Sequence, residues 1–215
     1  PAAGRQGRTN ERIQHKIRVS GGPGGCTLRP PDMFTHLHTH TEYSLLDGMS
    51  KMAPLMDRVK ALGQEAVAMT DHGALYGAID FYREATSRGI KPIIGLEAYV
   101  APGSRLTRER GDSSPYHLVM LARNMTGYKN LIALTTKANL EGFYYKPRID
   151  RELIEKHSEG ITVLSGCPSA EFHRRIQEGD REGAMTVAKY YRGVFDGHYY
   201  LEVQDHGDEK FTRLN

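Results

Sequence analysis

Three histidines alternate with other residues close to position 38 of the chain. In the stretch 34–48, an extended backbone would point His36, His38 and His40 to one face. Imidazole is among the commonest metal ligands, and Asp47 can bring a carboxylate to the same place. The spacing therefore predicts a site for a divalent metal ion. The alternative is a histidine-rich strand whose rings lie in water.

Further side chains able to bind metal follow, or lie late in, other apolar segments. These are His72 after the run 66–70, Glu97 late in the run 92–100, and Cys167 after the run 161–165. The carboxyl ends of parallel strands meet at one rim, so we expect these groups beside the paired histidines. Taken singly, the histidine could cap a turn, the carboxylate could pair with an arginine, and the cysteine could fill a core. Their joint placement favours a common site.

Two histidines do not follow this rule. His117 precedes its apolar run 118–122 and would lie at the opposite end of the sheet, unless that strand is short or reversed. The spacing leaves its role open. His36 lies deeper in its strand and is interpreted as structural. The others are interpreted as surface or satisfied side chains: His15, His157, His173, His198 and His206.

The predicted ligand set contains imidazoles, carboxylates and one thiol. This mixture suits Zn²⁺, Mn²⁺ or iron better than Mg²⁺, which prefers oxygen. It contains more ligands than one ion needs, which predicts two or three ions. Paired ions activate water and stabilise displacement at phosphorus, so the predicted reaction is hydrolysis of a phosphoester.

Apolar periodicity alternates between the helical and the strand type along the chain. The expected helices are 52–62, 76–87, 126–140, 151–157 and 170–195, the last long or broken; the expected strands are 66–70, 92–100, 116–122, 161–165 and 198–203. Thr126 is the expected cap of the third helix. Such alternation predicts parallel pairing in an α/β fold, either most of a barrel or an open doubly wound sheet.

Composition adds few constraints on function. The chain has 215 residues, and no run of 18 apolar residues predicts a membrane span. Two cysteines are too few for a disulfide framework, which favours a reduced, cytoplasmic setting. Residues 1–33 carry six Lys or Arg against two acidic residues, so the net charge of +3 leaves the remainder nearly neutral. Overall charge therefore does not indicate a nucleic-acid partner.

The first 32 residues differ in composition from the rest. They are rich in Gly, Pro, Arg and Gln and lack apolar periodicity, so we expect a disordered or non-native basic arm. Met33 is then the expected native start, and residues 33–215 form the predicted domain.

The motifs together resemble the PHP (polymerase and histidinol phosphatase) superfamily, and most closely the amino-terminal PHP domain of the alpha subunit of bacterial replicative DNA polymerase III. The matching stretches are 34–48, Thr70-Asp71-His72-Gly73, 91–99, 127–131, 141–148 and 165–169. The resemblance implies a distorted (β/α)₇ barrel. It implies the metal ligands His38, His40, Asp47, His72, Glu97, His117 and Cys167, of which His38, His40, His72 and Glu97 are the expected catalytic residues. This would settle His117 as a ligand.

The resemblance also implies a function within DNA replication. The expected activity is metal-dependent 3′–5′ exonuclease proofreading at a primer end, in a nucleotidyltransferase that also binds a sliding clamp and an exonuclease subunit. Lys146 and Arg148 are the expected DNA-phosphate contacts, although both could be solvated loop charges. Two alternatives remain open: a structural domain that docks a separate exonuclease subunit, and a free-standing small-molecule phosphatase.

One departure from the family pattern concerns the end of the chain. The family completes its site with an Asp-x-His pair late in the domain, whereas Asp205 and His206 are adjacent here. The sequence therefore predicts a barrel truncated at its C-terminus, with an incomplete and inactive site in this fragment.

Overall fold

A computed structural model of the chain describes residues 34–45, 47–207, 211 and 215. The helices are α1 (Met52–Ala61), α2 (Ala78–Ser87), α3 (Met125–Leu140), α4 (Arg151–Lys156), α5 (Glu171–Gln177) and α6 (Arg181–Val194), with a 3₁₀ turn, η1, at Arg110–Ser113. The strands are β1 (Ala66–Met69), β2 (Lys91–Val100), β3 (Tyr116–Ala122), β4 (Phe143–Tyr144), β5 (Lys146–Ile149), β6 (Ile161–Leu164) and β7 (Tyr199–Tyr200). The expected arm 1–32 lies outside the described residues. Among those described, no helix is long and apolar enough to cross a membrane.

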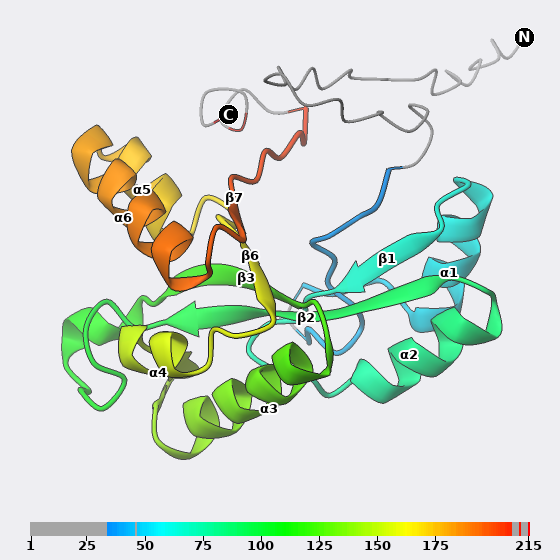
Figure 1. Cartoon of the computed structure of the whole chain (residues 1–215), viewed down its shortest axis with the longest axis horizontal. Coiled ribbons are helices and arrows are strands. Elements are labelled where there is room, and N and C mark those ends of the chain that lie inside the picture. The colour runs from blue at the N-terminus through cyan, green and yellow to red at the C-terminus, as the bar shows by residue number, and fades with distance from the viewer. Residues whose placement is uncertain (1–33, 46, 208–210, 212–214) are drawn as a thin grey trace, which may run out of the picture. The chain divides into compact units, whose positions relative to one another are not determined.

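The ten-residue strand β2 organises the sheet (Figure 1). Its first half pairs in parallel with β1, and its last residues pair in parallel with β5 on the same edge. Strand β3 occupies the other edge, followed by β6 and β7, while β4 forms a hairpin with β5. Strands β1, β3 and β5 therefore pair directly with β2, and β4, β6 and β7 join the sheet through β5 and β3.

Strand β3 runs antiparallel to both β2 and β6. The expectation of purely parallel pairing is therefore wrong for this strand. The reversal has a direct consequence for His117, which begins the strand and lies opposite Tyr99, near the end of β2. Because an antiparallel strand starts where its neighbour ends, His117 lies at the same rim as the other predicted ligands.

The predicted (β/α)₇ barrel is not confirmed, because the sheet is open. On one side, residues 36–40 add to β1 through the backbone bonds from Ala68 N to His36 O and from Thr70 N to Thr39 O. On the other side, β7 is two residues long. Within the described residues, no backbone hydrogen bond joins these two edges. Side-chain contacts of His38 with Glu202 and Gln204 cross the opening.

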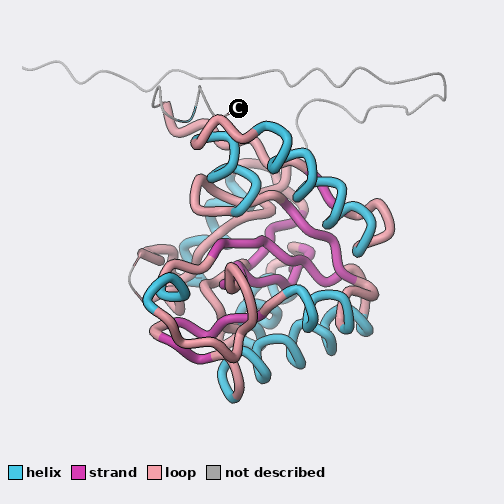
Figure 2. Tube along the Cα trace, turned by 90° about the vertical axis from the view of Figure 1, so that its left-hand side faces the viewer, coloured by secondary structure: helices cyan, strands magenta, loops and turns pink. Residues whose placement is uncertain are grey.

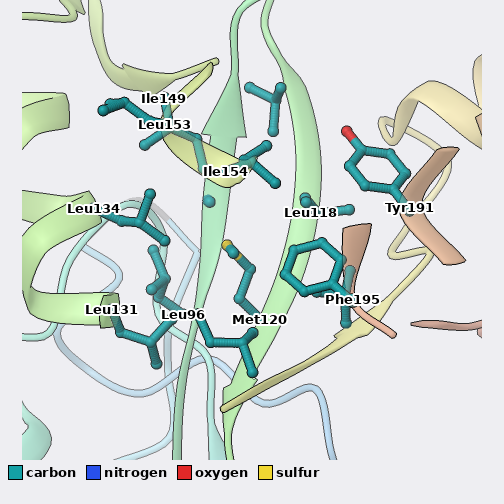
Figure 3. Packing of buried hydrophobic residues seen from close by; sticks show 14 of the residues in the cluster. Leu96, Leu118, Met120, Leu131, Leu134, Ile149, Leu153, Ile154, Tyr191 and Phe195 are labelled. Atoms are coloured by element: carbon teal, nitrogen blue, oxygen red, sulfur yellow. The ribbon is translucent and has the colours of Figure 1, made fainter. Parts of the chain in front are cut away.

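The main core lies against one face of the sheet. Leu96, Ala98 and Val100 of β2 point into it, together with side chains from α3 and α6 (Figure 3). Figure 2 shows the strands lying between helices on either side. Since side chains alternate along a strand, Glu97 and Tyr99 must point to the opposite face. The core therefore fixes which face of β2 carries chemistry.

The structure corrects the predicted cap of one helix and shows that the segment 170–195, predicted as one long or broken helix, is broken. Helix α3 is capped by Asn124, whose side chain accepts a hydrogen bond from Gly127 N, and not by the predicted Thr126. The long helix 170–195 is broken into α5 and α6 at Gly179, where φ is +78°. Glycine adopts this left-handed conformation at little cost, which ends α5 and allows Asp180 to cap α6.

The cap assignment can be tested by comparing two alanine variants. We expect Asn124→Ala to lower the free energy of unfolding by about 1 kcal/mol, because Gly127 N loses its acceptor. Thr126→Ala, at an exposed position two residues later, should leave stability within about 0.5 kcal/mol of wild type. Urea unfolding followed by circular dichroism measures both. Equal effects of the two substitutions would contradict the assignment.

Candidate metal centre

The carboxylate of Glu97 lies at the centre of four imidazoles. Its side chain is 1% exposed. Oε1 lies 3.0 Å from His117 Nδ1 and 3.5 Å from His38 Nε2, and Oε2 lies 3.1 Å from His40 Nε2 and 2.9 Å from His72 Nδ1. A buried carboxylate is stable only with such partners around it. Glu97 therefore joins histidines from three separate segments of the chain.

Local structure places His72 and His117 beside this carboxylate. The turn after β1 continues to pair with β2, since Gly73 N donates to Glu97 O and Glu97 N donates to Asp71 O. The Tyr99 ring stacks on His72 at 5.7 Å and meets His117 edge-on at 5.1 Å. Tyr99 thus limits the orientations available to both imidazoles.

The loop that follows the histidine stretch is held by a buried aspartate. Asp71, with no exposed surface, accepts hydrogen bonds from Thr41 N (2.6 Å), Thr41 Oγ1 (2.7 Å) and Ser44 Oγ (2.8 Å). These bonds position the loop that carries Asp47. Asp47 Oδ2 then lies 2.9 Å from His72 Nε2. Because the Asp47 side chain is 55% exposed, this side of the cluster faces solvent.

The thiol of Cys167 approaches the cluster from the loop after β6. Gly166 has a φ of +77°, which turns the chain between the strand and the cysteine. Cys167 Sγ lies 3.4 Å from Glu97 Oε1 and 3.6 Å from His117 Nδ1. Burial and the charge of Glu97 raise the pKa of this thiol to about 12. Without a metal ion, the sulfur is therefore protonated and donates toward the carboxylate.

The pKa values in the cluster are shifted by the charges of the neighbouring side chains. The four imidazoles hold the pKa of Glu97 far below its usual range, in spite of its burial. Burial alone would lower the pKa of His38, but Glu202 and Glu97 raise it to about 10. The pKa of His72 is raised in the same way by Glu97 and Asp47, against the effect of burial. The carboxylates thus carry negative charge, and in the metal-free chain they favour a proton on His38 and His72, which an arriving metal ion would replace.

The donor atoms form three overlapping groups that suit metal ions. They are His38–His40–Glu97, His40–Asp47–His72 and His72–Glu97–His117, and within each group the ligand atoms lie within 4.8 Å of one another. Atoms at such separations can share an ion about 2 Å from each. His72 Nδ1, although buried and near Glu97, makes no hydrogen bond of acceptable geometry. Nitrogen and oxygen donors, with a thiol alongside, fit a borderline ion such as Zn²⁺.

The structure brings the seven predicted ligands to one place: His38, His40, Asp47, His72, Glu97, His117 and Cys167. His36 takes a different position from the one expected, because it is exposed and its ring lies against Phe34.

The two predicted DNA contacts have different surroundings. Lys146 Nζ lies 5.2 Å from the centre of the Tyr99 ring, beside the cluster. Arg148 has no exposed surface, and its guanidinium donates to the carbonyls of Gly142, Arg105 and Thr107. A side chain enclosed in this way cannot reach a phosphate. The proposed phosphate contact by Arg148 is therefore corrected to a structural role.

Sequence reasoning missed Glu202 and Gln204 near the site. Glu202 Oε1 lies 2.7 Å from His38 Nδ1 and accepts a hydrogen bond from Gln204 Nε2 at 2.6 Å. The available signal was the alternation of apolar and polar residues in 201–204, which places both polar side chains on one face.

Comparison with known proteins agrees with this geometry. Residues 36–206 match the model of the PHP domain. The chain belongs to the PHP domain family. Proteins named DNA polymerase III subunit alpha are 46% identical over 187 residues in Thermus aquaticus, 48% over 177 in Treponema pallidum, and 47% over 205 in Mycobacterium tuberculosis H37Rv. These alignments cover 85%, 81% and 88% of the chain, respectively. The predicted resemblance is confirmed.

The chain covers only a small part of the length of these relatives. It spans 15% of the Thermus and Treponema proteins and 17% of the Mycobacterium protein. A solved amidohydrolase from Chromobacterium violaceum aligns at 25% identity with a TM-score of 0.36, over 48% of the chain and 32% of its own length. This similarity is too low to support a fold assignment. The fold is therefore described from the strands and helices of this chain alone.

Metal binding by this PHP domain should strengthen as pH rises. His38 holds a proton below a pKa of about 10 in the metal-free chain, and an ion must displace any proton on the nitrogen it takes. Between pH 7 and 9, we expect apparent affinity for Zn²⁺ to rise up to about tenfold per pH unit for each proton released. Calorimetry in buffers of different ionisation enthalpy counts those protons. An affinity independent of pH would contradict this assignment.

Proposed function

We propose that this PHP domain is a metal-dependent phosphoesterase within a bacterial replicative DNA polymerase, and that it hydrolyses the 3′-terminal phosphodiester of DNA. The observation that carries the proposal is the convergence of nitrogen, oxygen and sulfur donors on the buried carboxylate of Glu97. The PHP match and the names of the most similar relatives support the setting in DNA replication. The proposed substrate class is therefore a DNA strand with a free 3′ end.

The three donor groups define which residues would hold ions. Glu97, His40 and His72 each belong to two of the groups, so these three side chains would be central to holding any ions. When bound, divalent ions lower the pKa of coordinated water and stabilise charge that develops at phosphorus. The protein supplies a fixed arrangement of ligands, since Asp71 and Tyr99 hold the loop and the rings in place.

The exposed side of the cluster provides a direction for substrate approach. Asp47 marks this side, with more than half of its side chain in solvent. On the β4–β5 hairpin, Lys146 lies over Tyr99 and Tyr145 is 71% exposed. Tyr145 also has a φ of +57°, unusual for a residue with a side chain, which indicates that the turn is constrained.

These properties suit contact with an unpaired DNA end. A lysine positions a phosphate by charge without reading sequence, and an exposed tyrosine can stack on any base. We therefore propose Lys146 as the phosphate contact and Tyr145 as the base contact. This arrangement accepts a strand of any sequence, as proofreading requires.

Exonuclease activity of the full-length polymerase tests the proposed reaction. We expect Mn²⁺- or Zn²⁺-dependent release of nucleotides from the 3′ end of a single-stranded oligonucleotide, and loss of at least about a hundredfold in rate for His72→Ala, because two ligand groups share this imidazole. DNA synthesis by the same variant should persist. His36→Ala is the matched control, since His36 comes from the same site region but is exposed and outside the donor groups.

Absence of metal-stimulated release from the wild-type polymerase would overturn the proposed reaction. Tight binding of a separate exonuclease subunit by that inactive protein would then select the structural, partner-docking alternative.

Substrate contact by the hairpin is tested by Lys146→Gln and Tyr145→Ala in the same polymerase. Removing one phosphate contact should raise KM and reduce the slope of log affinity against log salt by about 0.7 for a single strand. Removing the tyrosine ring should weaken single-strand binding by about 1–3 kcal/mol. Both variants should bind Zn²⁺ like wild type, and unchanged KM in both would refute the proposed contacts.

A further inference from the structure

Glu202 touches the metal centre from the opposite edge of the open sheet. Its Oε1 lies 2.7 Å from Nδ1 of His38, a residue 164 positions earlier. Both side chains are largely buried, at 11% and 13% exposure. A contact this short between two shielded groups is a specific hydrogen bond and not a passing surface pair.

The position of Glu202 is fixed by its neighbours. Its backbone N–H donates to Ser165 Oγ at 2.8 Å, just after β6. Its Oε1 also accepts a hydrogen bond from Gln204 Nε2 at 2.6 Å. The carboxylate is therefore held in place both through the main chain and through its own oxygen.

The chemistry of the two partners decides which nitrogen of His38 carries the proton. A carboxylate only accepts hydrogen bonds, so Nδ1 of His38 must donate. In a neutral imidazole with the proton on Nδ1, the lone pair lies on Nε2. That atom is 3.1 Å from His40 Nε2 and 3.5 Å from Glu97 Oε1, within the first donor group. Gln204 Nε2 is farther from His38 Nδ1, at 3.4 Å, and does not compete with the carboxylate.

We propose that Glu202 is a positioning residue of the metal centre, which holds His38 in the tautomer and orientation that present Nε2 to an ion. This rests on the proposed metal centre and assigns it a partner outside the predicted ligand set. Carboxylates that bind the second nitrogen of a metal-ligating imidazole orient the ring and increase its basicity. In this chain the role falls to a residue on the last described segment, so the centre depends on both edges of the sheet.

The other oxygen of Glu202 remains available for a further contact. Among the described residues, Oε2 is buried without a hydrogen-bond partner. Glu202 also lines a small cavity, together with Gly166, Pro168, His173, Gln204, Phe211 and Asn215. His173 Nδ1, also buried, lacks a hydrogen-bond partner in the same part of the chain. A water molecule in this cavity would satisfy such groups without altering the bond to His38.

The test uses the complete chain with Zn²⁺ as the probe, in competition with a chromophoric chelator. We expect Glu202→Ala to weaken Zn²⁺ binding by about 10- to 100-fold. Glu202→Gln should have a smaller effect, because an amide oxygen still accepts from His38 Nδ1. Glu178→Gln is the matched control, since this carboxylate is exposed at the end of α5 and lies outside the donor groups. Thermal unfolding of each metal-free chain checks that it folds.

A second readout separates positioning from a general loss of structure. Long-range ¹H–¹⁵N spectra of the imidazoles report the His38 Nδ1–H proton, with or without zinc. We expect a downfield, slowly exchanging proton in wild type and in Glu202→Gln, and its loss in Glu202→Ala. Weakened zinc binding with an unchanged His38 resonance would overturn the proposal, because Glu202 would then act by another route.

Two zinc-binding outcomes distinguish this inference from the proposed function. If wild type and Glu202→Ala bind zinc equally, the positioning role is overturned while the metal centre stands. If wild type binds no zinc, the metal centre itself is overturned, and a positioning role is overturned with it.

Discussion

The burial of one negative charge organises this PHP domain. Glu97 lies in the second half of β2 with almost no exposed surface, where an isolated carboxylate would be strongly destabilising. Four imidazoles compensate it. They come from three segments: the stretch beside β1, which supplies two, the turn after β1, and the reversed strand β3. Because the free energy of burying the carboxylate is offset only when these segments pack around it, the fold that buries Glu97 also brings the donor groups together.

Much of the site was predictable because residue chemistry and strand ends carry strong signals. The apolar runs before His72 and around Glu97 identified β1 and β2, and the rule that strand ends share a rim brought their polar residues together. Local caps were less predictable. Thr126 and Asn124 are both plausible cap residues two positions apart, and only the backbone geometry distinguishes them.

The features that sequence could not predict depend on contacts between distant segments. Residues 116–122 contain no local signal for parallel or antiparallel pairing. Only the antiparallel pairing with β2 shows at which end of the sheet His117 lies. The sequence predicts Arg148 to be a surface cation because it lies in an irregular segment, 142–150, that contains basic and aromatic residues. Its burial follows from carbonyls supplied by residues near 105 and 142, which no local pattern reveals. The sheet stays open in part because β7 is only two residues long, whereas the sequence predicts a strand over 198–203.

Separation along the sequence divides the contacts of the centre into an early and a late group. Asp47 and His72 are 25 residues apart and come together around β1 alone, whereas His38 and Glu202 are separated by 164 residues. Closing a long loop costs more entropy and delays contacts on the folding pathway. During synthesis, the first ligands can therefore gather on the ribosome long before Glu202 emerges. The hydrogen bond from His38 to Glu202 can form only after residue 202 has been made.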